Sequence, residues 1–194
     1  MKLAVNKLAI PEVLEIRPKQ IADDRGFFSE TYNQADMQAA GIATHWVQDN
    51  HVLSREAGVL RGLHYQAPPR AQAKLLRVTH GAIYDVAVDI RRGSPTFGQY
   101  VGVTLSAAEW NQLFIPEGFA HGYLTLEPMT EVIYKVSDLY SREHDRAIAF
   151  DDPEIGIEWP LAGSAPILSD KDRGAPKLAE QDTGFVYERA KVAP

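Results

Sequence analysis

The sequence predicts a mainly β protein that folds as a sandwich or a jelly-roll barrel. Short runs rich in apolar and β-branched residues recur closely along the chain, turn residues separate them, and helix signals are few. Residues 83–90 show the strand pattern, because they alternate loosely and contain several Val and Ile side chains. Many short, closely spaced strands are typical of double-sheet β architectures.

The expected elements follow one another with little linker between them. We expect strands at residues 13–17, 26–31, 44–53, 59–66, 74–79, 81–89, 100–105, 112–115, 121–125 and 131–136. Turn signals such as Pro68-Pro69 and His80-Gly81 lie between these runs. A short helix is predicted over residues 34–40, where Gly41 ends it. From residue 151 onward Pro, Asp, Gly and Lys become more frequent, so residues 151–194 are expected to form a short irregular and helical extension packed on the barrel.

Composition limits the classes of function. A chain of 194 residues with 45% hydrophobic and 24% charged residues fits one soluble domain over residues 1–194. The formal net charge of −6 argues against a general nucleic-acid-binding protein, and no apolar run is long enough to span a membrane. The N-terminal residues lack the apolar region of a signal peptide, so we expect a cytoplasmic protein. The absence of cysteine excludes disulfides, thiolate metal sites and a cysteine nucleophile.

The most informative segment is residues 58–66, an apolar strand pattern that contains Arg61 and His64. Burying such groups without partners is costly, so a strand that carries them usually serves a site. Residues three apart face opposite sides of a regular strand, but Gly62 or a bulge would bring both into one cavity. The alternative is a core histidine that a backbone carbonyl satisfies.

Other polar residues lie on predicted strands and turns. Gln48 and Asn50 alternate and can line one face of a strand, although they also fit a strand end. Lys74 begins a strand, where a buried lysine would stabilise an oxyanion, although most such lysines are surface residues.

Residues 23–30 read as a turn followed by an alternating strand. Arg25 lies on one side of this strand, and Phe28 and Glu30 lie on the other. Arginine with aromatic residues suits the stacking of a base and the pairing of a phosphate. A hairpin with solvated charges explains the pattern equally well.

Further candidates for acid–base chemistry lie in the second half of the chain. His121 leads into a strand, and Tyr134 and Tyr140 flank Lys135. A buried tyrosine hydroxyl can act as a general acid, although tyrosine is also a common strand residue. Asp172, within residues 168–172, can orient a histidine, although a solvated acidic turn is the commoner outcome.

Metal and nucleotide-cofactor motifs are missing from the sequence. The six histidines form neither His-x-His nor His-Glu-x-x-His, and Tyr65-Gln66 follow His64 where a metal-binding cupin has a second histidine. There is no Gly-x-Gly-x-x-Gly and no phosphate-binding P-loop. We therefore expect a protein without a metal or other cofactor.

Taken together, the segments resemble the dTDP-4-dehydrorhamnose 3,5-epimerase family of cupin-fold sugar-nucleotide epimerases. The matching segments run in the family's order and cover nearly the whole chain: residues 24–30, 48–50, 58–66, 72–75, 85–91, 94–98, 115–122, 134–135 and 168–172. The resemblance implies a cupin, or double-stranded β-helix, barrel.

The resemblance also implies roles for residues. His64 matches the family's general base, Asp172 the carboxylate that pairs with it, Tyr134 the general acid, and Lys74 the group that stabilises the enolate. The expected substrate-binding residues are Arg25, Phe28, Glu30, Gln48, Asn50, Arg61, Gln66, His121, Tyr140 and Lys171. Of these, Tyr140 matches an aromatic residue near the thymine. In the family, the residues matching Arg25, Phe28 and Glu30 come from the neighbouring subunit, which implies a homodimer.

The activity that the resemblance implies is epimerisation of dTDP-4-keto-6-deoxyglucose at C3 and C5, in dTDP-rhamnose biosynthesis. Both carbons flank the C4 ketone, so removal of either proton gives an enolate, and inversion needs a base and an acid on opposite faces. No redox step occurs. The alternatives are an epimerase that inverts one carbon only, a non-catalytic cupin that binds a nucleotide sugar, and, with least support, a metal-dependent cupin oxygenase.

Overall fold

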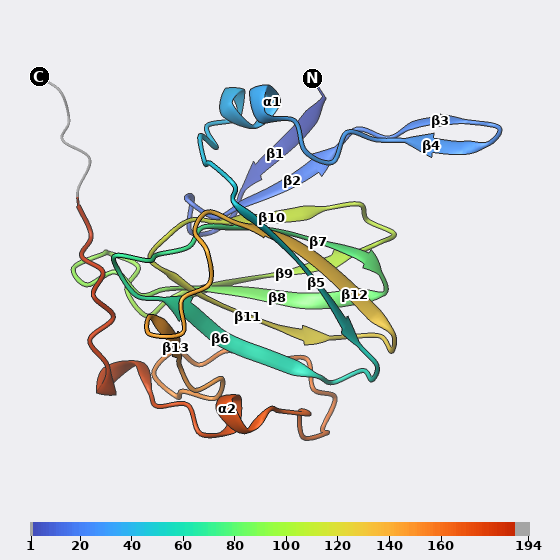
Figure 1. Ribbon diagram of the computed structural model, residues 1–194. Helices are drawn as coiled ribbons and strands as arrows, with labels where there is room; N and C mark the ends of the chain where they lie inside the picture. The colour runs from blue at the N-terminus through green and yellow to red at the C-terminus, as the bar shows by residue number, and fades with distance from the viewer. Residues whose placement is uncertain (1, 189–194) are drawn as a thin grey trace, which may run out of the picture.

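Two antiparallel sheets packed face to face form the body of the protein, in a computed structural model that describes residues 2–188 (Figure 1). The six-stranded sheet has the order β1 (Leu3–Lys7), β2 (Leu14–Pro18), β10 (Gln112–Ile115), β7 (Lys74–His80), β12 (Thr130–Val136), β5 (Gln48–Ser54). The five-stranded sheet has the order β13 (Asp145–Ala147), β6 (Leu60–Gln66), β11 (Phe119–Thr125), β8 (Ala82–Asp89), β9 (Tyr100–Ser106). This arrangement confirms the predicted mainly β, jelly-roll fold.

Smaller elements lie outside the two sheets. Strands β3 (Ile21–Asp23) and β4 (Gly26–Phe28) form a hairpin that extends away from the body (Figure 1). Asn33 caps the start of helix α1 (Gln34–Ala39), because its side chain accepts hydrogen bonds from two backbone N–H groups of the first turn. Helix α2 (Asp170–Arg173) and the 3₁₀ turn η1 (Leu178–Glu180) lie in the C-terminal extension. Within residues 2–188, no helix has the length and apolar character needed to cross a membrane.

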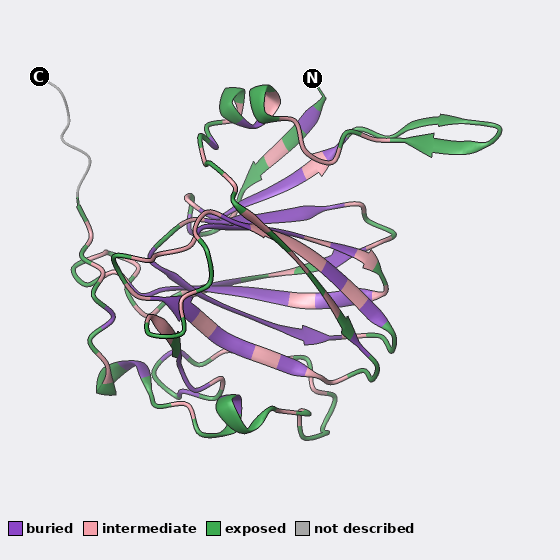
Figure 2. Cartoon of the chain, viewed as in Figure 1, coloured by how far each residue is buried: buried purple, intermediate pink, exposed green. Residues whose placement is uncertain are grey.

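Strand β8 shows that the five-stranded sheet is covered on both faces, by the other sheet on one side and by the C-terminal extension on the other. Ile83 and Ala87 alternate toward the space between the sheets, where they join the core residues Leu76 and Val132 of the six-stranded sheet. Tyr84 and Val86 face outward and pack under the C-terminal extension, against residues such as Ile155. Both faces of β8 are therefore buried, and Figure 2 shows the strands of the two sheets mostly in purple. Burial on both faces explains why the apolar alternation of this strand is loose.

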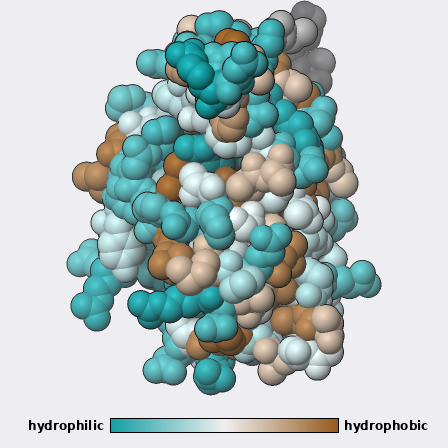
Figure 3. Space-filling view, turned by 90° about the vertical axis from the view of Figure 1, so that its right-hand side faces the viewer, coloured by the Kyte–Doolittle hydropathy of each residue, from teal (hydrophilic) through white to brown (hydrophobic). Residues whose placement is uncertain are grey.

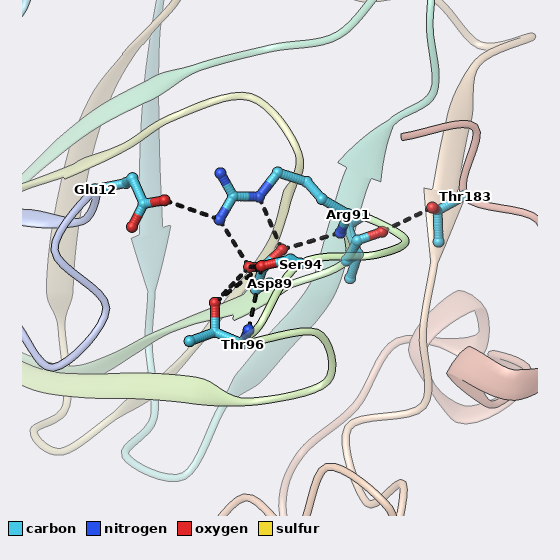
Figure 4. Close-up of polar contacts among 7 residues, drawn as sticks. Glu12, Asp89, Arg91, Ser94, Thr96 and Thr183 are labelled. Carbon is cyan, nitrogen blue, oxygen red and sulfur yellow. Dashed lines mark hydrogen bonds and ion pairs between the residues drawn. The ribbon is translucent and has the colours of Figure 1, made fainter. Parts of the chain in front are cut away.

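A buried hydrogen-bond network fixes the turn after β8 (Figure 4). The Asp89 carboxylate is fully buried and accepts hydrogen bonds from the Arg91 guanidinium and from the hydroxyls of Ser94 and Thr96. Burial alone would raise the pKa of Asp89, but these hydrogen bonds outweigh it and hold the pKa below the usual value. Asp89 is therefore an ionised anchor for the turn.

The same network joins the C-terminal extension to the barrel. The Thr183 hydroxyl donates to the backbone carbonyl of Ile90 at 2.8 Å, and Arg91 lies over the rings of Phe119 and Tyr187 at 4.6 and 5.0 Å. Thr183 and Tyr187 of the extension therefore contact the end of β8 and the turn that follows it. Residues 189–194 of the predicted extension lie outside the described residues.

Several boundaries differ from the sequence-based expectation. Strands β1, β3 and β13 were not predicted, and two of them have only three residues each, too few for an alternating pattern. The strand expected at residues 26–31 ends at Phe28, and the one expected at 44–53 begins only at Gln48. The predicted helix is present as α1.

Candidate active site

A cavity of about 370 Å³ opens between the two sheets. Its walls come from both sheets and from the extension, and they combine an apolar part with a dense polar part. The apolar lining is Val52, Val59, Leu60, Ile167 and Leu168, and the polar lining is Arg61, His64, Lys74, His121, Tyr123, Tyr134, Ser169 and Asp172. Concave sites with a few convergent polar groups are typical of small-molecule binding.

An irregularity in strand β6 places Arg61 and His64 in this one cavity. The pairing of β6 with β11 shifts register beside Gly62, whose φ of +121° lies in the region that favours glycine. A Cβ atom on Gly62 would lie 2.6 Å from the Cα atom of Gly122, so the two strands approach more closely than side chains allow. The strand thus has both a glycine and a bulge at this point, either of which was considered from the sequence as a way to bring Arg61 and His64 into one cavity.

His64 forms a short contact with a carboxylate from the distant extension. Its Nε2 atom lies 2.5 Å from Oδ1 of Asp172, whose side chain is only 3% exposed. Burial raises the pKa of Asp172, but hydrogen bonds with His64 and Ser169 outweigh this effect and hold the pKa below its usual value. Asp172 is therefore ionised at neutral pH and can orient the imidazole and stabilise its protonated form.

Lys74 lies at the start of β7, and its side chain is buried beside this pair. Its Nζ atom donates to the backbone carbonyl of His64 at 3.3 Å. Burial lowers the pKa of Lys74 to about 8, and the nearby Asp85 carboxylate opposes the shift. The ammonium is thus mostly charged at neutral pH, in a place where an anionic group of a ligand would neutralise it.

Tyr134 faces the cavity from the sheet opposite His64. It lies on β12 of the six-stranded sheet, whereas His64 lies on β6 of the five-stranded sheet. Burial raises the pKa of Tyr134 and the positive charge of Arg61 opposes the shift, so the hydroxyl keeps its proton at neutral pH. The cavity therefore has a histidine on one wall and a protonated phenol on the other.

A second histidine–carboxylate pair lies in the same cavity wall. His121 Nε2 is 2.6 Å from Oδ1 of Asp85, and both side chains are buried. Burial lowers the pKa of His121, and the charge of Asp85 opposes this. His121 was predicted as a site residue from the sequence, but Asp85 was not. Asp85 lies within the apolar run of β8, where no neighbouring residue marks it as part of a site. Tyr123 and Ser169 were also not predicted as cavity residues, because tyrosine and serine are ordinary in strands and turns.

Four of the expected substrate-binding residues surround one loop, and none of the four lines the cavity. Gln66 donates to the carbonyl of Leu139 and accepts from the N–H of Ser141, and Gln48 accepts from the N–H of Tyr140. Gln48 also donates to Asn50 at 2.8 Å. These amides hold the loop, and the Tyr140 side chain remains exposed.

Lys171 does not line the cavity either, and its Nζ atom is 2.5 Å from Oδ2 of Asp145. The Tyr140 hydroxyl donates to the same carboxylate oxygen at 3.3 Å. Asp145 thus links the exposed Tyr140 to helix α2, which also carries Asp172.

The remaining three expected residues lie far from the cavity wall on or beside the β3–β4 hairpin. Arg25 is exposed and pairs with its neighbour Asp23, Phe28 is 64% exposed, and Glu30 pairs with Lys2 at 2.9 Å. The hairpin points toward the viewer at the top of Figure 3, where hydrophilic side chains surround a few hydrophobic ones. The chain does not bring these residues to its own cavity.

Across residues 2–188, no three His, Asp or Glu side chains lie close enough together to hold a metal ion. His64 and His121, the two histidines of the cavity, each pair with a carboxylate.

Two facing antiparallel sheets that enclose a polar cavity define a cupin-type jelly-roll protein. The chain belongs to the dTDP-4-dehydrorhamnose 3,5-epimerase family, whose model matches residues 7–180. A relative named dTDP-4-dehydrorhamnose 3,5-epimerase from Pseudomonas aeruginosa is 52% identical over 181 residues, which cover 93% of this chain and 98% of the relative.

Solved structures agree with this assignment. A dTDP-6-deoxy-D-glucose-3,5-epimerase from Legionella pneumophila, in complex with dTDP-4-keto-L-rhamnose, superposes with a TM-score of 0.92 at 43% identity, covering 96% of this chain and 100% of that chain. ChmJ, a 3'-monoepimerase from Streptomyces bikiniensis in complex with dTDP-quinovose, superposes with a TM-score of 0.82 at 34% identity, covering 89% of this chain and 86% of that chain.

Proposed function

We propose that this protein inverts C3 and C5 of dTDP-4-dehydro-6-deoxy-D-glucose to give dTDP-4-dehydro-L-rhamnose. The observation that carries the proposal is the placement of His64 and Tyr134 on facing sheets, with the cavity between them. A sugar ring held in this cavity has a base on one face and an acid on the other. Inversion by proton transfer needs this arrangement, and binding alone does not.

In the proposed mechanism, His64 removes a proton from a carbon next to the C4 ketone. Because Asp172 is ionised and holds Nε2, that nitrogen carries the proton of the neutral imidazole, and Nδ1 is the basic atom. The resulting enolate carries negative charge on the C4 oxygen, which the Lys74 ammonium stabilises. Tyr134 then donates a proton to the same carbon from the opposite face, which leaves His64 protonated and Tyr134 as a phenolate. His64 releases its proton to solvent and Tyr134 regains one from solvent, and repetition at the second carbon completes the reaction.

The other residues bind the nucleotide and the phosphates. Arg61 lies in the cavity wall and supplies positive charge for the diphosphate, and His121 contacts the sugar. The exposed ring of Tyr140 stacks on the thymine, and Lys171 lies beside it. Gln48, Asn50 and Gln66 complete the binding surface, directly or through the loop that they hold.

We propose that the active form is a homodimer in which the β3–β4 hairpin reaches the partner's cavity. Arg25 lies at the turn of the extended hairpin and Phe28 at the base of its second strand, and both side chains are highly exposed. Exposed aromatic and arginine side chains are typical of an interface. In this arrangement, Arg25, Phe28 and Glu30 would complete the substrate site of the neighbouring subunit. The enzyme is proposed to be cytoplasmic. It is also proposed to need no cofactor, because the reaction transfers protons only.

Double inversion is favoured over single inversion by the names of the relatives. The Pseudomonas and Legionella proteins, at 52% and 43% identity, are named as 3,5-epimerases, whereas the 3'-monoepimerase ChmJ is 34% identical. The test is incubation of the purified protein with dTDP-4-keto-6-deoxyglucose and identification of the product by NMR. We expect dTDP-4-dehydro-L-rhamnose from the wild-type protein, and a rate of its formation that is lower by roughly 10²-fold or more with His64→Asn. A product inverted at one carbon only would show that the protein is a monoepimerase, and the absence of turnover would refute the proposal.

A further inference from the structure

Ser169 makes two hydrogen bonds to one residue, Asp172. Its Oγ atom accepts from the backbone N–H of Asp172 at 3.2 Å and donates to the carboxylate Oδ2 atom of the same residue at 2.7 Å. The first bond caps the start of helix α2. Because the N–H group occupies a lone pair of Oγ, the hydroxyl proton is free to point at the carboxylate.

The Asp172 carboxylate thereby has a separate partner for each oxygen. Oδ1 faces His64 at 2.5 Å and Oδ2 faces Ser169, so a three-member chain runs from the extension to the imidazole. Two hydrogen bonds at different oxygens fix the rotation of the carboxyl group about its Cβ–Cγ bond. They also oppose the effect of burial and keep the group ionised.

We propose that Ser169 is a positioning residue for the His64–Asp172 pair: its hydroxyl turns the buried carboxylate toward the imidazole and shares its negative charge. This inference rests on the proposed function, in which His64 is the base. Partners that orient a functional group from behind commonly affect activity without touching the reacting atoms. Ser169 is exposed at the edge of the cavity, and a bound sugar nucleotide would shield its hydrogen bond from water.

A purely structural role as a helix cap is the alternative, and two variants separate the roles. Ser169→Gly removes the hydroxyl, and glycine is nearly as good as serine at the start of a helix. Ser169→Thr keeps a hydroxyl that can make both bonds. Ser169→Ala is a second variant without the hydroxyl and is expected to behave like Ser169→Gly.

The main readout is the pH profile of kcat/KM. Without the serine donor, the carboxylate attracts the protonated imidazole more strongly, so the acidic limb should move to higher pH. Other charged or titratable groups that face the pair are Lys74, Arg61, His121, Asp85 and Tyr134, and all are unchanged in the variants. We expect Ser169→Gly to lower kcat about tenfold or more with little change in KM, and Ser169→Thr to restore both kcat and the limb.

A double variant decides whether the serine acts through His64. In a His64→Asn background, Ser169→Gly should cause no further loss of the residual activity, because the base that it positions is absent. An equal loss in both backgrounds, or a normal kcat and pH profile in a folded Ser169→Gly protein, would overturn the inference. Inactivity of the wild-type protein would instead refute the proposed function.

Discussion

His64 Nε2 and Asp172 Oδ1 lie 2.5 Å apart although 108 residues separate them in the sequence. The histidine belongs to a strand of the barrel and the carboxylate to a four-residue helix in the extension. Because the extension packs on the outer face of the five-stranded sheet, its α2 helix is held at the mouth of the cavity. The His64–Asp172 pair therefore forms only when the extension is docked.

The lowered pKa of Lys74 predicts an alkaline limit to activity. The lysine is charged below its pKa of about 8 and loses its charge as the pH rises through that value. If the ammonium stabilises the enolate, kcat should fall above about pH 8, and Lys74→Met should remove this limb and lower kcat roughly 10²-fold. Steady-state rates between about pH 6 and pH 10 measure this.

Lys135→Met is the matched control for the lysine experiment. Lys135 lies on β12 and pairs with Asp49, and it is not among the residues that line the active-site cavity. Its replacement should leave the alkaline limb in place. An unchanged limb in Lys74→Met would mean that another group titrates.

Tyr134→Phe should separate proton removal from inversion. The phenol is the proposed acid on the face opposite His64, and phenylalanine keeps the ring while removing only the proton donor. The enolate should still form and His64 should return the proton, so exchange with solvent should persist while inversion falls roughly 10²-fold. The ratio of exchange to inversion in D₂O is the quantity to measure. Inversion of both centres at the normal rate would assign the acid to another residue, and Tyr140 would be tested first.

Gly62→Ala should destabilise the protein and remove the site geometry together. A Cβ atom there meets the Gly122 backbone at 2.6 Å, and φ is +121°. We expect a loss of about 2–4 kcal/mol in the free energy of unfolding. Gly93→Ala is the control, since Gly93 has a φ of +80° but nothing within 4 Å, and it should cost only about 1–2 kcal/mol. Equal losses in chemical denaturation would contradict the close approach of β6 and β11.

Mixed dimers test whether subunits share their sites. An Arg25→Ala subunit supplies an intact His64, and a His64→Asn subunit supplies an intact Arg25. If the hairpin crosses to the partner, a dimer of the two variants has one complete site and one site with both defects. Co-expression with two affinity tags should therefore give about half of the wild-type activity per dimer. Activity no higher than the average of the two parent variants would mean that each subunit uses its own hairpin.

Much of the fold follows from residue patterns that are visible in the sequence. Each of the ten predicted strands has a counterpart, because burial enforces apolar runs such as that of β8. The spacing of Arg61 and His64 showed that a regular strand would separate the two side chains, and it left open whether Gly62 or a bulge brings them together.

Other features depend on contacts that no local pattern encodes. The strand β13 is short and lies next to β6 only because the extension turns back onto the barrel. Asp85 is one of several charged residues within strands, and only the fold brings its carboxylate to His121. Ser169 reads as an ordinary turn residue until Asp172 is seen to pair with His64.

The most direct test of the central claim is the position of deuterium in the product formed in D₂O. The account predicts that the wild-type protein converts dTDP-4-keto-6-deoxyglucose to a product labelled at both C3 and C5, because each inversion replaces the original proton with one from the solvent-exchanged acid. NMR of the isolated product locates the label. Deuterium at only one of the two carbons would contradict double inversion, and an inverted product without deuterium would contradict acid–base catalysis through exchangeable side chains.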